Sequence, residues 1–142
     1  MNEYQAFLQS KQLITAQAGF AVAPGAIHPR LFDWQRDIVR WALLQGRAAL
    51  FEECGLGKTL QQLEWARHVA AHTGGRVLIL APLAVAHQTI AEARTIDLDV
   101  AYVRSQEQAD SAGPVVITNY DMLKAFDPAA FAGVVLDESS IL

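Results

Sequence analysis

Cysteine is nearly absent from this sequence, since Cys54 is the only one in 142 residues. A single cysteine excludes an internal disulfide framework and suits a reducing cytoplasm. Charged residues are also sparse, at 18%, whereas hydrophobic residues make up 52%. This balance excludes a disordered chain and favours one globular α/β domain with a core of its own.

Long apolar runs and an excess of basic residues are missing as well. A membrane-spanning helix needs about 20 consecutive apolar residues, and the longest run here, Val77 to Ala86, is shorter and contains Pro82. The N-terminus lacks the basic-then-apolar order of a signal peptide. The formal net charge is −4, so no global positive field attracts nucleic acid. We therefore expect a cytoplasmic protein with no membrane partner. The charge counts against a DNA-binding module but is compatible with a motor whose contacts with nucleic acid come from loops and helix ends, or from parts beyond this chain.

The stretch from Glu52 to Thr59, E-E-C-G-L-G-K-T, carries the strongest chemical signal. An apolar run at 48–51 precedes it, as a strand would, and a helical pattern begins at Leu60. A strand, a glycine turn ending in Gly-Lys-Thr and a helix are the parts of a phosphate-binding loop. The strict pattern has glycine where this chain has Glu52, so an ordinary glycine turn before a helix is the alternative.

The residue types in this stretch suit a triphosphate bound with Mg²⁺. Gly55 and Gly57 let backbone N–H groups surround an anion, and the dipole of the following helix adds positive potential. Lys58 can reach the β- and γ-phosphates, while the Thr59 hydroxyl can bind Mg²⁺.

A second candidate motif is Val134-Val135-Leu136-Asp137-Glu138, an apolar strand that ends in two carboxylates. In a Walker B strand, Asp137 holds Mg²⁺, directly or through water, and Glu138 polarises the attacking water. Taken alone, such a run is better interpreted as a strand end in solvent. Behind a phosphate-binding loop, the Walker B interpretation is favoured.

Apolar residues from Leu31 to Leu44 recur at helical spacing, and Gly46 is a stop signal for that helix. We expect Trp34 and Trp41 to lie in the core. Gln35, on the same helix, can offer a donor and an acceptor to the edge of an adenine. A surface glutamine on an amphipathic helix is the alternative.

The remaining segments alternate between apolar strands and helices. Strands are expected at 76–80, 98–103, 115–120 and 134–136, helices from residue 83 to about 94 and at 122–126, a polar connection at 105–113, and an N-terminal helix with an extended linker over 1–30. This alternation predicts a parallel sheet covered by helices on both faces, with Lys58, Pro82, Thr118 and Asp137 at the carboxyl ends. His68 and His72 are expected to be solvated rather than metal ligands.

Taken in order, these motifs resemble the first motor domain of superfamily-two helicases. The segments that carry the resemblance are L-F-D-W-Q-R (31–36), E-E-C-G-L-G-K-T (52–59), L-A-P-L (80–83), V-I-T-N-Y-D-M-L (116–123) and L-D-E-S-S (136–140). The chain is similar to the Swi/Snf-type branch, and within it to phage-like DEAD/DEAH-box helicases with a D-E-S-S box. That branch writes its loop D-E-M-G-L-G-K-T, which accounts for the two glutamates here.

The resemblance implies a RecA-like P-loop fold of the α/β class, with 1–30 as N-terminal helix and linker and 31–142 as a partial ATP-binding domain. It implies ATP and Mg²⁺ as cofactors and nucleic acid, DNA in the first place, as partner. By position, the nucleotide-binding residues are Gln35, Gly55, Leu56, Gly57, Lys58, Thr59 and Leu60. The Mg²⁺ ligands are Thr59 and Asp137, the catalytic residues are Lys58 and Glu138, and the residues that touch nucleic acid are Pro82, Thr118, Asn119 and Tyr120.

The resemblance also implies parts beyond this chain. Such helicases continue with a strand that lies between the phosphate-loop and Walker B strands, and with a second RecA-like domain that supplies the arginine finger. The chain, incomplete at its C-terminus, is therefore expected to be poorly stable and to have negligible turnover alone. Ser139 and Ser140 replace the usual box residues and leave the coupling to strand movement open.

Other functions fit parts of the pattern. A kinase or a small GTPase also has a phosphate-binding loop, but this sequence displays neither an acceptor site with a lid nor a guanine-reading N-K-x-D. A nucleotide-binding module without catalysis is the non-enzymatic alternative. Intact Lys58, Thr59, Asp137 and Glu138 argue against it. A helicase or translocase is the leading hypothesis, acting in the cytoplasm, that of a host cell if a phage encodes it.

Overall fold

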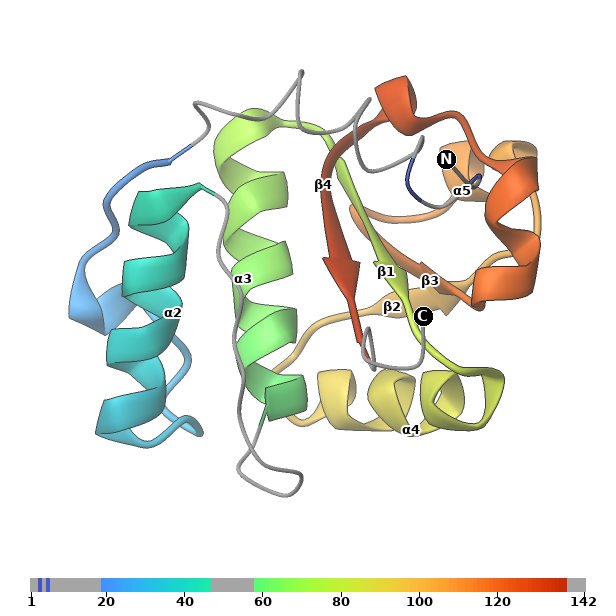
Figure 1. Cartoon of the computed structure of the whole chain (residues 1–142). Coiled ribbons are helices and arrows are strands. Elements are labelled where there is room, and N and C mark those ends of the chain that lie inside the picture. The colour runs from blue at the N-terminus through green and yellow to red at the C-terminus, as the bar shows by residue number, and fades with distance from the viewer. Residues whose placement is uncertain (1–2, 4, 6–18, 47–57, 138–142) are drawn as a thin grey trace.

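The computed structural model describes residues 3, 5, 19–46 and 58–137 (Figure 1). The regular elements, in chain order, are η1 (Pro24–Ala26), α2 (Asp33–Gln45), α3 (Lys58–Thr73), β1 (Arg76–Leu80), α4 (Leu83–Arg94), β2 (Val100–Tyr102), α5 (Gln106–Ser111), β3 (Val115–Thr118), η2 (Tyr120–Ala125), η3 (Pro128–Ala130) and β4 (Phe131–Leu136). The candidate residues Gly55, Leu56, Gly57 and Glu138 lie outside the described residues, as does the strand expected at 48–51.

The described strands form one parallel sheet in the order β2-β3-β1-β4. All of β3 and four of the five residues of β1 are buried, as expected for apolar runs inside a parallel sheet. Successive residues of β1 face opposite sides, so Val77 and Ile79 belong to one core cluster and Leu78 and Leu80 to the other. The α/β class and the parallel sheet are therefore confirmed, in an arrangement compatible with Rossmann-like and RecA-like domains.

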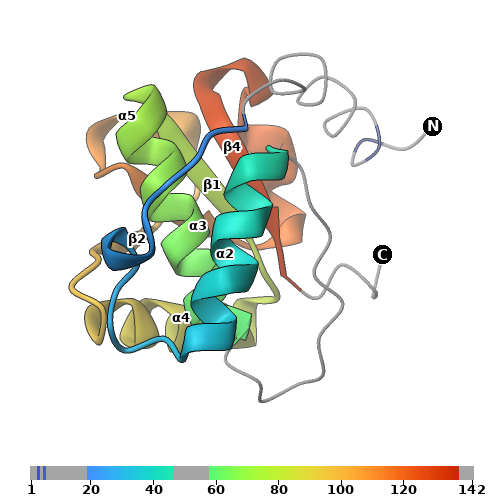
Figure 2. The ribbon, with the colours of Figure 1, turned by 90° about the vertical axis from the view of Figure 1, so that its left-hand side faces the viewer.

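Helices flank both faces of this sheet. Helices α3 and α4 supply buried residues to the first core cluster, whereas α5 and η2 supply them to the second. Helix α2 lies against the outside of α3, as Figures 1 and 2 show from two directions. Both helices begin at the end of the molecule where the strands have their carboxyl ends (Figure 1).

The face of α2 that lies against α3 is not the one expected. Its buried residues include Gln35, Val39 and Leu43, whereas Trp34 and Trp41 are 43% and 49% exposed. The placement of both tryptophans in the core was therefore wrong. Two adjacent stripes of α2 are apolar, and helical periodicity alone does not decide which stripe meets a neighbour. The predicted stop was right, because Gly46 follows the helix with a φ of 79°.

Several element boundaries differ from those expected. The polar connection at 105–113 contains helix α5, which Ser105 caps by accepting a hydrogen bond from the N–H of Gln108. The segment after β3 is a 3₁₀-helix that already begins at Tyr120, and η1 interrupts the expected linker. Strand β4 is longer than 134–136, because Phe131 and Gly133 also pair with β1. No helix among these described parts of the chain is long and apolar enough to cross a bilayer.

Gly133 of β4 allows α3 to approach the sheet closely. A Cβ atom at this position would lie 3.2 Å from the Trp65 ring and 3.2 Å from Val69. Gly133→Val is therefore expected to lower the free energy of unfolding by about 1–2 kcal/mol through overpacking, as measured by urea denaturation. Gly113→Ala is the control, because a Cβ there would meet nothing within 4 Å. Equal losses in the two variants would contradict the close packing.

Candidate functional site

The carboxyl ends of β3, β1 and β4 meet side by side. The N–H of Ala81 donates to the carbonyl of Thr118 at 3.1 Å, and the N–H of Asp137 donates to the carbonyl of Leu80 at 2.8 Å. Parallel strands end on the same edge, where ligands of open α/β sheets bind. The candidate residues Pro82, Thr118 and Asp137 therefore share this edge.

Lys58 lies at the same edge, because it is the first residue of α3. Its Nζ atom is 3.5 Å from Oδ1 of Asp137, and the Asp137 side chain is only 4% exposed. The structure thus brings together two candidate residues that belong to separate motifs far apart in the sequence. A buried carboxylate beside an ammonium group places two opposite charges at this edge.

Gln62 completes the surroundings of this carboxylate, and the sequence interpretation missed it. Its Nε2 atom donates to Oδ1 of Asp137 at 3.4 Å. Residues four apart on a helix lie on the same face, so the spacing from Lys58 to Gln62 is the signal that could have identified it. Asp137 is contacted by an ammonium and an amide from one helix.

The other candidates on α3 have different surroundings. Thr59 and Leu60 lie in the first turn of the helix and are partly buried. Leu60 packs against the core cluster between the sheet and α3. Only its backbone is therefore suited to a nucleotide, whereas the Thr59 hydroxyl follows directly on Lys58 at the sheet edge.

Gln35 is buried, with 3% of its surface exposed. Its Oε1 atom accepts a hydrogen bond of 2.8 Å from the N–H of Phe32, which is the N-cap of α2. The acceptor half of its amide is therefore used to begin its own helix, as in a capping box. The surface alternative is wrong, because Gln35 is buried, whereas the adenine-reading role stays a prediction.

The residues expected to touch nucleic acid are joined to the protein interior. Asn119 donates from Nδ2 to the Tyr102 hydroxyl, and the Tyr120 hydroxyl donates to the backbone carbonyl of Asp137, each over 2.6 Å. Thr118 is fully buried, and its Oγ1 atom has no hydrogen-bond partner among the described residues. Pro82 is the N-cap of α4. Tyr120 consequently connects the segment after β3 to the edge that carries Lys58.

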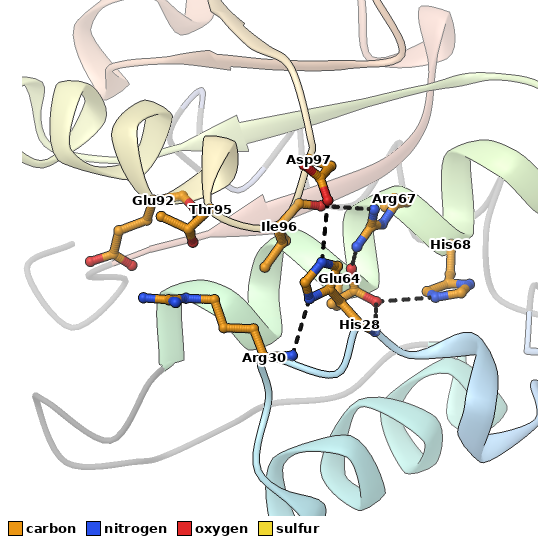
Figure 3. Close-up of polar contacts among 9 residues, drawn as sticks. All are labelled: His28, Arg30, Glu64, Arg67, His68, Glu92, Thr95, Ile96 and Asp97. Carbon is orange, nitrogen blue, oxygen red and sulfur yellow. Dashed lines mark hydrogen bonds and ion pairs between the residues drawn. The ribbon is translucent and has the colours of Figure 1, made fainter.

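A second polar cluster surrounds Glu64, which is fully buried on α3 (Figure 3). Its carboxylate is ion-paired with Arg67 and lies 3.3 Å from Nε2 of His68. It also accepts a hydrogen bond of 3.1 Å from the backbone N–H of His28. A buried carboxylate is tolerated only when paired in this way, so Glu64 fastens the segment before α2 to α3.

The same cluster reaches the turn between α4 and β2. Arg67 donates to the carbonyl of Ile96 at 3.0 Å, and the His28 ring lies 3.4 Å from the Asp97 carboxylate. Asp97 has a φ of 59°, an uncommon value for a residue other than glycine. The contacts in Figure 3 thus join three segments of the chain that are distant in sequence.

Of the two histidines of α3, His72 is exposed as expected, whereas His68 is largely buried, so the expectation was wrong for His68. His68 is paired with Glu64, and the His72 ring stacks on Phe20 with centroids 3.9 Å apart. Burial first, and then the positive charge of Arg67, lower the pKa of His68, while a hydrogen bond with the Ala26 backbone raises it. Burial outweighs this hydrogen bond, so the net shift of the His68 pKa is downward.

The lowered pKa of His68 predicts a loss of stability in acid. Because the unfolded chain binds this proton more strongly, the stability contributed by neutral His68 is present above about pH 6.5. It is lost as the pH falls through the lower pKa of the folded state. The free energy of unfolding, measured with urea, should therefore fall less between pH 7.5 and pH 5.5 for His68→Gln than for the unchanged chain. His87→Gln is the control, because His87 is exposed on α4, and it should lose as much stability between the two pH values as the unchanged chain. Equal losses in His68→Gln and His87→Gln would contradict the role given to His68.

Asp137 and Thr59 have oxygen atoms that could hold Mg²⁺. Nowhere in 19–46 or 58–137 do three or more His, Cys, Asp or Glu side chains come together as metal ligands. Mg²⁺ prefers oxygen ligands and is commonly held by one or two carboxylates plus the phosphates of a nucleotide. The Asp137 carboxylate and the Thr59 hydroxyl are donors of this kind.

No protein-family model matches this sequence, and no match was found among curated proteins. The assignment of function therefore depends on the geometry of the sheet edge and on the motifs themselves.

Proposed function

We propose that the chain is the ATP-binding half of a nucleic-acid-dependent ATPase, a helicase or DNA translocase of the Swi/Snf-like superfamily-two type, built on a RecA-like domain. The observation that supports this proposal most is the contact between Lys58 Nζ and the buried Asp137 carboxylate at the carboxyl edge of a parallel sheet. The two groups belong to separate candidate motifs. A phosphate-binding loop and a Walker B strand are expected to meet in this way, whereas an ordinary glycine turn and an ordinary strand end are not.

Each residue then has a definite part in binding Mg²⁺ and ATP. The positive charge of Lys58 is paired with the Asp137 carboxylate. Because an ammonium group has three donors, Lys58 can bind phosphate oxygens in place of this partner. Asp137 is left to bind the metal, directly or through water, and Thr59 offers a hydroxyl ligand. Mg²⁺ supplies charge neutralisation of the β- and γ-phosphates. Glu138 is assigned, from the motif, to activate the attacking water.

Equilibrium binding of a fluorescent, non-hydrolysable ATP analogue tests this proposal. We expect saturable binding that Mg²⁺ strengthens, and displacement by ATP but not by AMP, because Lys58 contacts the outer phosphates. Binding to a labelled DNA duplex should weaken as salt is added, since contacts with phosphates release counterions. Absence of ATP binding at millimolar concentration, or binding that Mg²⁺ does not affect, would contradict the proposal.

A further inference from the structure

The hydrogen bond from the Tyr120 hydroxyl to the Asp137 carbonyl crosses the sheet edge. Tyr120 opens η2, directly after β3, whereas Asp137 follows β4. Strand β1 lies between β3 and β4. The tyrosine side chain therefore reaches over the end of β1 to contact the next strand.

The sheet itself cannot supply this hydrogen bond. In a parallel pair, each residue donates to one position of the neighbouring strand and accepts from the position two residues later. Because Asp137 donates to the carbonyl of Leu80, its own carbonyl would accept from residue 82. That residue is Pro82, which has no N–H. The Tyr120 hydroxyl satisfies a carbonyl that β1 leaves without a donor.

Contacts on both sides consequently fix the backbone of Asp137. Its N–H is held by Leu80 at 2.8 Å and its carbonyl by Tyr120 at 2.6 Å. Fixing these two groups fixes the direction of the Cα–Cβ bond, and hence the position from which the carboxylate extends. The carboxylate then lies within 3.5 Å of Lys58 and 3.4 Å of Gln62.

We infer that Tyr120 is a positioning residue for Asp137, the candidate Mg²⁺ ligand, through the hydrogen bond between its hydroxyl and the Asp137 carbonyl. This inference rests on the proposed function, because it gives the tyrosine a part in holding the metal of that site. Groups that orient a metal ligand change metal affinity about 10–100-fold when they are removed. Tyr120 thereby acts at the nucleotide site, although it lies in η2 after β3 and Asp137 follows β4.

The variant Tyr120→Phe tests this role, because it removes one hydroxyl and keeps the ring. Mn²⁺ replaces Mg²⁺ as the probe and is titrated by electron paramagnetic resonance in the presence of a saturating non-hydrolysable ATP analogue. We expect the Kd of Mn²⁺ to rise about tenfold. Affinity for the analogue in the presence of EDTA should stay within about twofold of the unchanged chain. Tyr120→Leu, which also lacks the hydroxyl, must raise the Kd of Mn²⁺ in the same way.

Tyr102→Phe is the matched control. It removes a tyrosyl hydroxyl that pairs with Asn119 over the same distance of 2.6 Å but does not contact Asp137. Its Kd for Mn²⁺ should remain within about twofold of the unchanged chain. Equal weakening in Tyr102→Phe and Tyr120→Phe would overturn the inference.

A double-mutant cycle with Asp137→Asn separates positioning from general support of the fold. If Tyr120 acts through Asp137, the double variant has the same Kd for Mn²⁺ as Asp137→Asn alone. Additive losses would overturn the inference, as would an unchanged Kd in Tyr120→Phe or equal weakening of metal-free nucleotide binding. If one of these outcomes is found but the unchanged chain binds the nucleotide, the proposed function is not contradicted. An unchanged chain that binds neither nucleotide nor Mn²⁺ would overturn both.

Discussion

Lys58→Ala is expected to weaken binding of the ATP analogue on the order of 100-fold, which corresponds to about 2.7 kcal/mol. Lys58 begins α3 at the sheet edge, where its ammonium lies 3.5 Å from Asp137. Removing it takes away the positive charge that would meet the outer phosphates and leaves the Asp137 carboxylate facing them. Fluorescence titration with and without Mg²⁺ measures the loss.

Lys124→Ala provides the comparison for this change. Lys124 is exposed and pairs with Glu3 at 3.1 Å, so its removal alters the net charge equally without touching the edge. We expect its nucleotide affinity to equal that of the unchanged chain. Lys58→Ala removes the charged partner of the buried Asp137 carboxylate, and among the contacts described above only the one with Gln62 remains. Thermal unfolding of both variants therefore shows whether the fold is retained. An unchanged affinity in Lys58→Ala would remove this residue from the assigned role.

Glu64→Gln is expected to lower the free energy of unfolding by about 2–3 kcal/mol, because it breaks a buried ion pair at one end. Arg67 then loses its paired carboxylate, although its contact with the Ile96 carbonyl and the attraction of the Asp97 carboxylate remain. Arg67 is 29% exposed, so solvent limits the loss. The hydrogen bond to the His28 backbone is weakened as well, since its acceptor is no longer charged.

The loss should be measured by urea denaturation near pH 7.5, with Glu107→Gln as control. Glu107 is exposed on α5, and surface substitutions usually change stability by less than about 0.5 kcal/mol. Nucleotide binding should be retained by folded Glu64→Gln, because the cluster in Figure 3 does not include the residues at the sheet edge. A loss no greater than that of Glu107→Gln would show that the cluster contributes little to stability.

The strands and their alternation with helices could be predicted because the signals are local. Residues 77–80 and 115–117 are apolar without interruption, as suits strands buried on both faces. Gly46 and Gly74, at the ends of α2 and α3, have positive φ values that glycine adopts without strain. Each of these features depends on a few neighbouring residues.

The packing of α2 and the surroundings of the histidines could not be predicted, because they depend on partners distant in sequence. Trp34 and Gln35 are neighbours on one helix, yet the tryptophan is exposed and the glutamine is buried. Glu64 has the sequence surroundings of a surface residue. It is buried because the segment at His28 and the turn at Ile96 and Asp97 close over α3.

The sequence by itself determined the α/β class, the sheet-forming segments and the residue types suited to a phosphate and Mg²⁺. Only the tertiary structure decided that Lys58, Gln62 and Asp137 lie together and that Tyr120 fixes the Asp137 backbone. The reason is physical: strand order, and the proline that ends β1 beside β4, determine which groups meet at the carboxyl edge. The periodicity of apolar residues along the chain does not show which strand lies beside β4 or which side chain reaches the Asp137 carbonyl.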